Sequence, residues 1–165
     1  MIKTLILCLF IFSIPGRTAA QLTRSDTVSA QMMLLKSCRP DTGRIKLLLA
    51  LSGYYIDKPN ENKKDLDSAY TFLNQALKLS EDLHRIEWRN KTLALTASCD
   101  AQAGRLSHAK ACFIQIIDYY HKINHQQQEA ESWNALGKLI PADNKNDIPY
   151  KIQCYERART FCSYE

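Results

Sequence analysis

The sequence predicts an all-α chain, built as a helical-hairpin solenoid of about three pairs with a short N-terminal helix. Apolar residues recur at spacings of three and four beyond Asp41, and polar turns separate the periodic segments. No alternating stretch is long enough for a strand. Glycine and proline are scarce, at five each in 165 residues, so long helices are permitted.

The first twenty residues have the order of parts of a secretory signal peptide. Lys3 precedes an apolar run over 5–12, and small residues at 18–20 suit a cut before Gln21. The run is shorter than the roughly 20 residues that span a bilayer. The sequence therefore predicts an exported protein of the periplasm or cell envelope, without a membrane span in the mature chain. An uncleaved N-terminal anchor is the alternative.

Two further regions follow the signal peptide at 1–20. The segment 21–41 is predicted to hold one short capping helix, from about Ser25 to Cys38, packed on the first hairpin. The repeat domain then covers 42–165. Its helical pairs are expected at about 44–83, 86–124 and 128–162.

Turn residues separate the helices of the first two pairs. In the first pair, a helix over 44–56 ends before the loop at Pro59, and Asp65 or Asp67 is expected to cap its partner. In the second pair, Gly104 is expected at the C′ position after the first helix.

Turn residues also separate the two helices of the third pair. Its first helix, over about 128–139, is expected to stop at Pro141. A polar loop follows, and Pro149 suits the first turn of the last helix, which is expected to run to about Phe161.

A repeat relates the pairs. The first helices of the outer pairs align as Leu48-x-x-Leu51-Ser52-x-x-Tyr55 and Trp133-x-x-Leu136-Gly137-x-x-Ile140. A small residue stands at the same place in all three first helices, and we expect it to let two helices approach closely; these residues are Ser52, Ala97 and Gly137. Ala69 and Ala109 occupy matching places in the second helices, forty residues apart.

This pattern resembles the tetratricopeptide repeat, with Trp, Leu, Gly and Tyr on its first helix and Ala, Phe and Ala on its second. The resemblance covers about 44–161 and implies a solenoid of helical hairpins whose concave groove binds peptides or proteins. The chain departs from the pattern in spacings near forty rather than thirty-four, and in Thr96 and Lys151. A plain helical bundle, or a third pair that serves only as a cap, is the alternative.

The first pair carries a closer resemblance. Leu-Leu-Ala-Leu-Ser-Gly-Tyr-Tyr-Ile-Asp-Lys-Pro, followed by Lys-Asp-Leu-Asp-Ser-Ala-Tyr, is similar to the exported N-terminal repeats of sensor histidine kinases from Bacteroidetes-type bacteria. That resemblance implies the sensory part of a signalling system, a truncated relative of one, or a remnant of a longer gene. Kinase activity is not expected, because no phosphate-binding glycine motif is present.

The charge pattern argues against a nucleic-acid-binding protein, and the cysteine spacing argues against a redox or zinc site of the CxxC kind. The net charge of +5 comes without a Lys/Arg block, so nucleic-acid binding is not expected. Five cysteines follow the signal segment, without CxxC spacing, and are interpreted mainly as buried small residues. A disulfide in an oxidising compartment stays open.

Two pairs of side chains could carry chemistry, but neither is expected to. His121 and His125 are spaced i, i+4 and should share a face at the end of one helix, with Glu129 as a conceivable third ligand. Cys112 lies one turn after His108, but the sequence shows no third group for them. No enzyme activity, metal site or cofactor is therefore predicted.

The predicted function is the binding of a protein, a peptide or a neighbouring copy of the chain in the concave groove. The alternative is an envelope protein that binds a small molecule there, or an enzyme. The resemblance implies that first-helix side chains line the groove. The candidate binding residues are Lys46, Lys91, Ser98, Asn134 and Lys138.

Overall fold

The computed structural model describes residues 24–58 and 62–162. The described chain is all-helical, without a strand. Its helices are α1 (Arg24–Ser37), α2 (Thr42–Ile56), α3 (Lys63–Asp82), α4 (Ile86–Gln102), α5 (Leu106–Lys122), α6 (Gln126–Leu139) and α7 (Ile148–Cys162). The predicted signal peptide at 1–20 lies outside the described residues.

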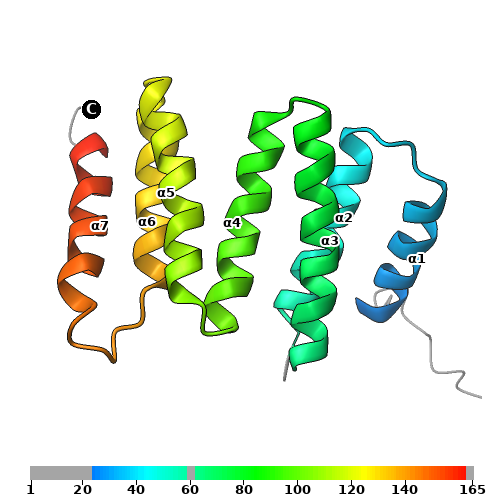
Figure 1. Ribbon diagram of the computed structural model, residues 1–165, viewed down its shortest axis with the longest axis horizontal. Helices are drawn as coiled ribbons and strands as arrows, with labels where there is room; N and C mark the ends of the chain where they lie inside the picture. Colours follow the sequence, from blue (N-terminus) through cyan, green and yellow to red (C-terminus); the bar gives the residue numbers. More distant parts are fainter. Residues whose placement is uncertain (1–23, 59–61, 163–165) are drawn as a thin grey trace, which may run out of the picture.

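The hairpins follow one another in chain order along one row, with α2 behind α3 and α6 behind α5 in the view of Figure 1. Extensive contacts join successive helices, and α2 also reaches α4. The pairs α2–α3, α4–α5 and α6–α7 are the three predicted hairpins, and α1 is the predicted short helix packed on α2. The predicted fold class, an all-α solenoid of helical hairpins, is confirmed.

The apolar stripes expected from the sequence form the core. Ile45, Leu48 and Leu51 of α2 are completely buried against α1 and α3. A second cluster joins α4 through α7, and includes the completely buried Ala109 and Leu136. Because each cluster draws on neighbouring hairpins, every hairpin depends on the next one to bury its face.

Small residues permit close helix packing, as the repeat predicted. Ser52, Ala97 and Gly137 are all buried. At Gly137 the approach is tightest, since an added Cβ would lie 2.8 Å from Cε1 of Tyr155 on α7. A larger side chain there would displace that ring.

Three turns between helices share one backbone geometry. His84, Gly104 and Asn124 each have positive φ, at 51°, 75° and 54°. The residue after each one donates its N–H to a carbonyl five positions earlier, for example from Arg105 to Asp100 at 2.7 Å. This is the Schellman closure, so the prediction of Gly104 as a C′ glycine is confirmed.

The N-cap prediction for α3 was wrong. Asn62 caps this helix, and its side chain accepts from the N–H groups of Lys64 and Asp65. Asp65 sits at N3 and accepts from the N–H of Asn62, which completes a capping box. The carboxylate also accepts from Nζ of Lys58 at 2.7 Å, so it is held from two sides.

The described cysteines behave mainly as small apolar residues. Cys99, Cys112 and Cys154 are buried, Cys38 is partly buried, and none of these four forms a disulfide.

Candidate functional site

A groove crosses the molecule between α4 and α6, with α5 as its floor. It encloses about 250 Å³. α5 contributes apolar and aromatic side chains to its lining, whereas α4 and α6 contribute mainly polar ones: Asn90, Lys91, Ala94, Phe113, Ile116, Tyr120, Gln128, Glu131, Ser132 and Ala135. The groove exists because α4, α5 and α6 are consecutive helices of neighbouring hairpins, which present one face together.

Asn90 is the unusual residue of this groove. Its side chain is 3% exposed, yet within the described chain neither its Oδ1 nor its Nδ2 has a hydrogen-bond partner. A buried amide side chain without partners destabilises the folded state by about 1–3 kcal/mol. Such a group calls for a functional or structural explanation, and its position on the groove lining offers one.

Lys91 is the one candidate from the sequence that lines this groove. It forms an ion pair with Glu87, Nζ to Oε1 at 2.6 Å, and its Nζ lies 4.5 Å from the centre of the Trp88 ring. Lys46 of α2 reaches the same ring, at 5.5 Å. The structure therefore brings Lys46 and Lys91 together around Trp88.

The other candidates lie apart from the groove lining. Ser98 is half-buried and donates to the carbonyl of Ala94 within α4. Asn134 is half-buried and Lys138 is exposed, both on α6. Apart from Lys91, the groove lining consists of residues other than these candidates.

The sequence does contain a signal for Asn90. Asn90, Leu93 and Ala97 follow one another at spacings of three and four, so they form one stripe of α4. Leu93 and Ala97 belong to the core. A polar amide on an otherwise apolar stripe was visible in the sequence, but the absence of hydrogen-bond partners was not.

A second polar cluster lies where α4 meets α5. Asp100 is 1% exposed and accepts from Oη of Tyr70 at 2.5 Å and from Nε of Arg105 at 2.8 Å. Its other oxygen, Oδ2, contacts Nδ1 of His108. Burial alone would raise the pKa of Asp100, but the donors on Tyr70, His108 and Arg105 together hold that pKa below its ordinary value.

This cluster supplies the third group that the sequence did not show for His108 and Cys112. Sγ of Cys112 lies 4.0 Å from Nδ1 of His108, the same nitrogen that faces Asp100. Burial, followed by the nearby charge of Asp100, raises the pKa of the Cys112 thiol. A buried thiol with a raised pKa is a poor nucleophile, so the cluster does not resemble a cysteine-based catalytic site.

The predicted pairing of His121 and His125 on one helix face was wrong. α5 ends at Lys122, and the backbone turns through Asn124, so His125 is the N-cap residue of α6. His121 instead approaches Glu129, Nδ1 to Oε2 at 3.2 Å, and His125 approaches Gln128. The helix stops before the second imidazole, which removes the i, i+4 relationship.

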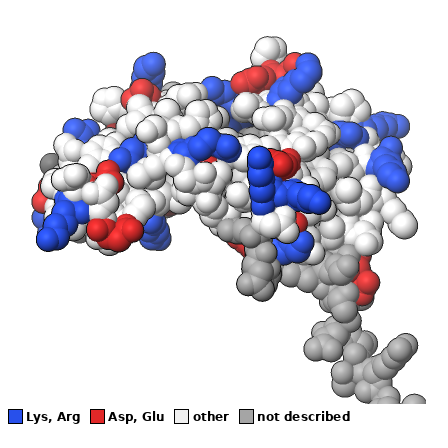
Figure 2. All heavy atoms as spheres, turned by 60° about the horizontal axis from the view of Figure 1, so that its bottom comes forward, with Lys and Arg blue, Asp and Glu red and all other residues white. Residues whose placement is uncertain are grey.

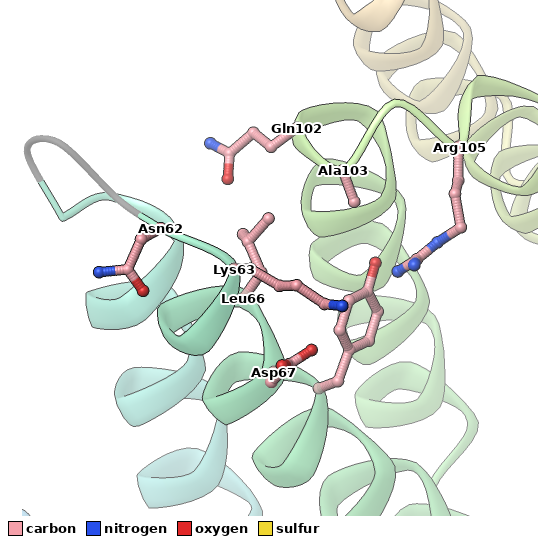
Figure 3. Close-up of a pocket in the computed structure, with 8 residues that line it drawn as sticks. Asn62, Lys63, Leu66, Asp67, Gln102, Ala103 and Arg105 are labelled. Atoms are coloured by element: carbon pink, nitrogen blue, oxygen red, sulfur yellow. The ribbon is translucent and has the colours of Figure 1, made fainter.

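A further cavity, of about 370 Å³, opens between the first turn of α3 and the last turn of α4. Figure 3 shows Lys63 and Arg105 extending into this space from opposite sides. Arg105 is already paired with Asp100, and its guanidinium lies 4.6 Å from the centre of the Tyr70 ring. Of the two cations at this cavity, Arg105 therefore already makes contacts with other residues of the protein.

Comparisons with protein-family models, with curated proteins and with solved structures found no match for the chain. Within the described residues, none of the helices combines the length and apolar character needed to cross a membrane.

Proposed function

We propose that this protein is an interaction module, which binds an extended peptide segment of a partner in the groove between α4 and α6. The unpartnered amide of Asn90 in that groove carries the proposal. A carboxamide presents one acceptor and two donors. In an extended strand the N–H and C=O of one residue point to the same side, so one residue of the peptide can pair with both atoms of Asn90. Both atoms are buried in the ligand-free structure, so the side chain must rotate toward the groove to meet the peptide.

The remaining lining suits the side chains of such a segment. Phe113, Ile116 and Ala135 provide an apolar floor and wall. Lys91 and Glu131, both exposed, stand at the rim with opposite charges. Backbone recognition by a buried amide would then supply affinity, while the apolar floor would select one side chain of the partner.

The sizes of the cavities favour a peptide over a small molecule. The cavities considered above enclose about 250 and 370 Å³, at the low end of the roughly 300–1,000 Å³ typical of small-molecule sites. An elongated groove on a solenoid suits a linear partner better. We propose binding rather than catalysis for the same reason.

The hairpin row and the sequence motif around Trp133 and Gly137 support a tetratricopeptide-like module. The signal-peptide pattern at 1–20 supports export to the periplasm or cell envelope. The resemblance of the first pair to sensor-kinase repeats supports a role in signal transduction, in which the module senses a peptide or protein outside the cytoplasm. Figure 2 shows positive and negative side chains interspersed on the visible face, which does not favour a polyanionic partner.

A displayed library of random peptides, selected on the immobilised protein, tests this proposal. Enriched sequences would be synthesised with a fluorophore, and their affinities measured by fluorescence polarisation. We expect Asn90→Leu to weaken binding roughly five- to 150-fold, because leaving buried backbone groups of the peptide without partners costs about 1–3 kcal/mol.

The matched control is Asn134→Leu, which changes the same residue type on α6 outside the groove lining. It should leave the affinity unchanged. The proposal fails if no peptide is enriched, or if Asn134→Leu weakens binding as much as Asn90→Leu does.

A further inference from the structure

Three potential metal ligands of different chemistry meet at the α4–α5 turn. Asp100 comes from the last turn of α4, and His108 and Cys112 lie one turn apart near the start of α5. Their ligand atoms, a carboxylate oxygen, an imidazole nitrogen and a thiol sulfur, all lie within 4.8 Å of one another. The Schellman turn at Gly104 fixes the two helices that carry them.

The ligand atoms converge rather than forming a chain. In a hydrolytic triad the histidine uses its two ring nitrogens separately, one toward the nucleophile and one toward the carboxylate. Here Oδ2 of Asp100 and Sγ of Cys112 both face Nδ1 of His108. Three ligand atoms within 4.8 Å of one another, two of them beside the same ring nitrogen, suit a coordination site better than a proton relay.

We propose that the α4–α5 hairpin binds one Zn²⁺ ion through Oδ2 of Asp100, Nδ1 of His108 and Sγ of Cys112. Zinc accepts this mixture of oxygen, nitrogen and sulfur, and it prefers four ligands in a tetrahedron. The His108 side chain is 63% exposed, so the fourth position faces solvent and takes a water molecule.

Small shifts suffice to form the site. With metal–ligand distances of about 2.0 Å for N and O and 2.3 Å for S, tetrahedral ligand atoms lie roughly 3.5 Å apart. The sulfur–nitrogen separation of 4.0 Å must shorten slightly, and the contact between His108 and Asp100 must lengthen. The exposed His108 ring can make both adjustments by rotating. Oδ2 of Asp100 and Sγ of Cys112 lie within 4.8 Å of each other, and a small rotation of the carboxylate brings them to the same spacing.

The surroundings already orient the carboxylate. Oη of Tyr70 and Nε of Arg105 both donate to Oδ1 of Asp100, and Oδ2, whose partner is His108, can turn toward the ion. Hydrogen bonds to the non-coordinating oxygen are the usual outer partners of a ligating carboxylate. The charges of Asp100 and a Cys112 thiolate balance the ion, and Arg105 remains outside.

Titration of the purified, metal-free protein with Co²⁺ tests the site. Cobalt replaces zinc at such sites, and a thiolate ligand gives it a charge-transfer band in the near ultraviolet. We expect this band to saturate at an equimolar ratio and to disappear when Zn²⁺ is added. Zinc affinity follows from competition with a chromophoric chelator.

Variants of two ligands and of one outer partner test the coordination. Cys112→Ser should abolish the band, and the control Cys154→Ser, at another buried cysteine, should leave it unchanged. His108→Gln alters an exposed side chain, so the fold should tolerate it, and we expect at least a tenfold loss of zinc affinity. Tyr70→Phe removes an outer partner and should weaken binding about tenfold.

The inference is overturned if the protein gives no charge-transfer band, if the band survives in Cys112→Ser, or if His108→Gln binds zinc as tightly as the unchanged protein. None of these outcomes bears on the groove between α4 and α6, because the two sites share no residue.

Discussion

At the scale of single residues, Asn90 couples stability to the proposed function. Its amide is buried without a partner in the described chain, so the folded state keeps the full desolvation penalty. The ligand-free protein is therefore less stable than a variant with an apolar side chain of similar shape. Proteins commonly retain such destabilising groups where binding or catalysis requires them.

Asn90→Leu should raise the free energy of unfolding by about 1–3 kcal/mol, because it removes two unsatisfied polar atoms without opening a cavity. Urea denaturation followed by circular dichroism measures the change. Asn134→Leu, at a half-buried position, should alter stability by no more than about 0.5 kcal/mol. Destabilisation by Asn90→Leu would mean that the amide has an internal role.

Asp65 is the residue with the clearest acid dependence. Its hydrogen bond from Lys58 holds the folded-state pKa below the ordinary value. A carboxyl group with a depressed folded-state pKa stabilises the fold above the unfolded pKa, near pH 4. That stabilisation is lost as the pH falls through the lower, folded-state value.

Asp65→Asn should therefore lower the melting temperature at pH 7, and the difference from the unchanged protein should narrow below about pH 4. Thermal melts across that range provide the measurement. Asp67→Asn is the matched control, since Asp67 is exposed in the next half-turn of α3. If Asp67→Asn had the larger effect, the capping box would not be the source of the stabilisation.

At the scale of elements, three turns between helices adopt the same backbone geometry, each with a different residue at the left-handed position. His84, Gly104 and Asn124 are spaced by twenty, and each takes the left-handed conformation. Glycine adopts this conformation freely and asparagine tolerates it, whereas in other residues it destabilises the backbone by roughly 1–2 kcal/mol. The hairpin geometry therefore prevails over local preference at His84, where tertiary packing holds the turn.

Two glycine substitutions should change the free energy of unfolding in opposite directions. Gly104→Ala should lower the free energy of unfolding by about 1 kcal/mol, because its φ is positive although an added Cβ meets nothing within 4 Å. Gly53→Ala, in the interior of α2 with equally open surroundings, should raise it by about 0.5–1 kcal/mol. Chemical denaturation of both variants gives the comparison, and a common sign would contradict the turn argument.

At the scale of the whole molecule, stability is distributed along the row. Contacts join successive helices, and the buried clusters divide between α1–α4 and α4–α7. Trp88 packs against the first part and Trp133 belongs to the second. Such quasi-one-dimensional proteins transmit a local destabilisation mainly to their neighbours, and the two tryptophans can report each half separately.

Gly137→Ala should loosen the α6–α7 contact, because its Cβ would lie 2.8 Å from the Tyr155 ring, and overpacking costs about 1–3 kcal/mol. In a Trp88→Phe background, fluorescence reports Trp133, and its denaturation midpoint should fall clearly. In a Trp133→Phe background, the Trp88 midpoint should fall less. Equal shifts would show that the described helices unfold as one cooperative unit.

Local sequence patterns were enough to predict the helices and much of their packing. Spacings of three and four located the apolar faces, and the small residues Ser52, Ala97 and Gly137 marked the positions of close packing. Gly104 marked the end of α4. These features could be predicted because helix periodicity, helix termination and steric size act between residues a few positions apart.

Which polar groups meet depends on how the helices pack, and local sequence patterns did not predict it. The sequence held Asn90, but three helices had to pack before its amide could be seen to lack partners. Asp100 is eight residues from His108, and a hairpin turn brings them into contact, whereas a turn at Asn124 separates His121 from His125. Whether a buried polar atom finds a partner depends on the path of the backbone between helices, which local spacing does not encode.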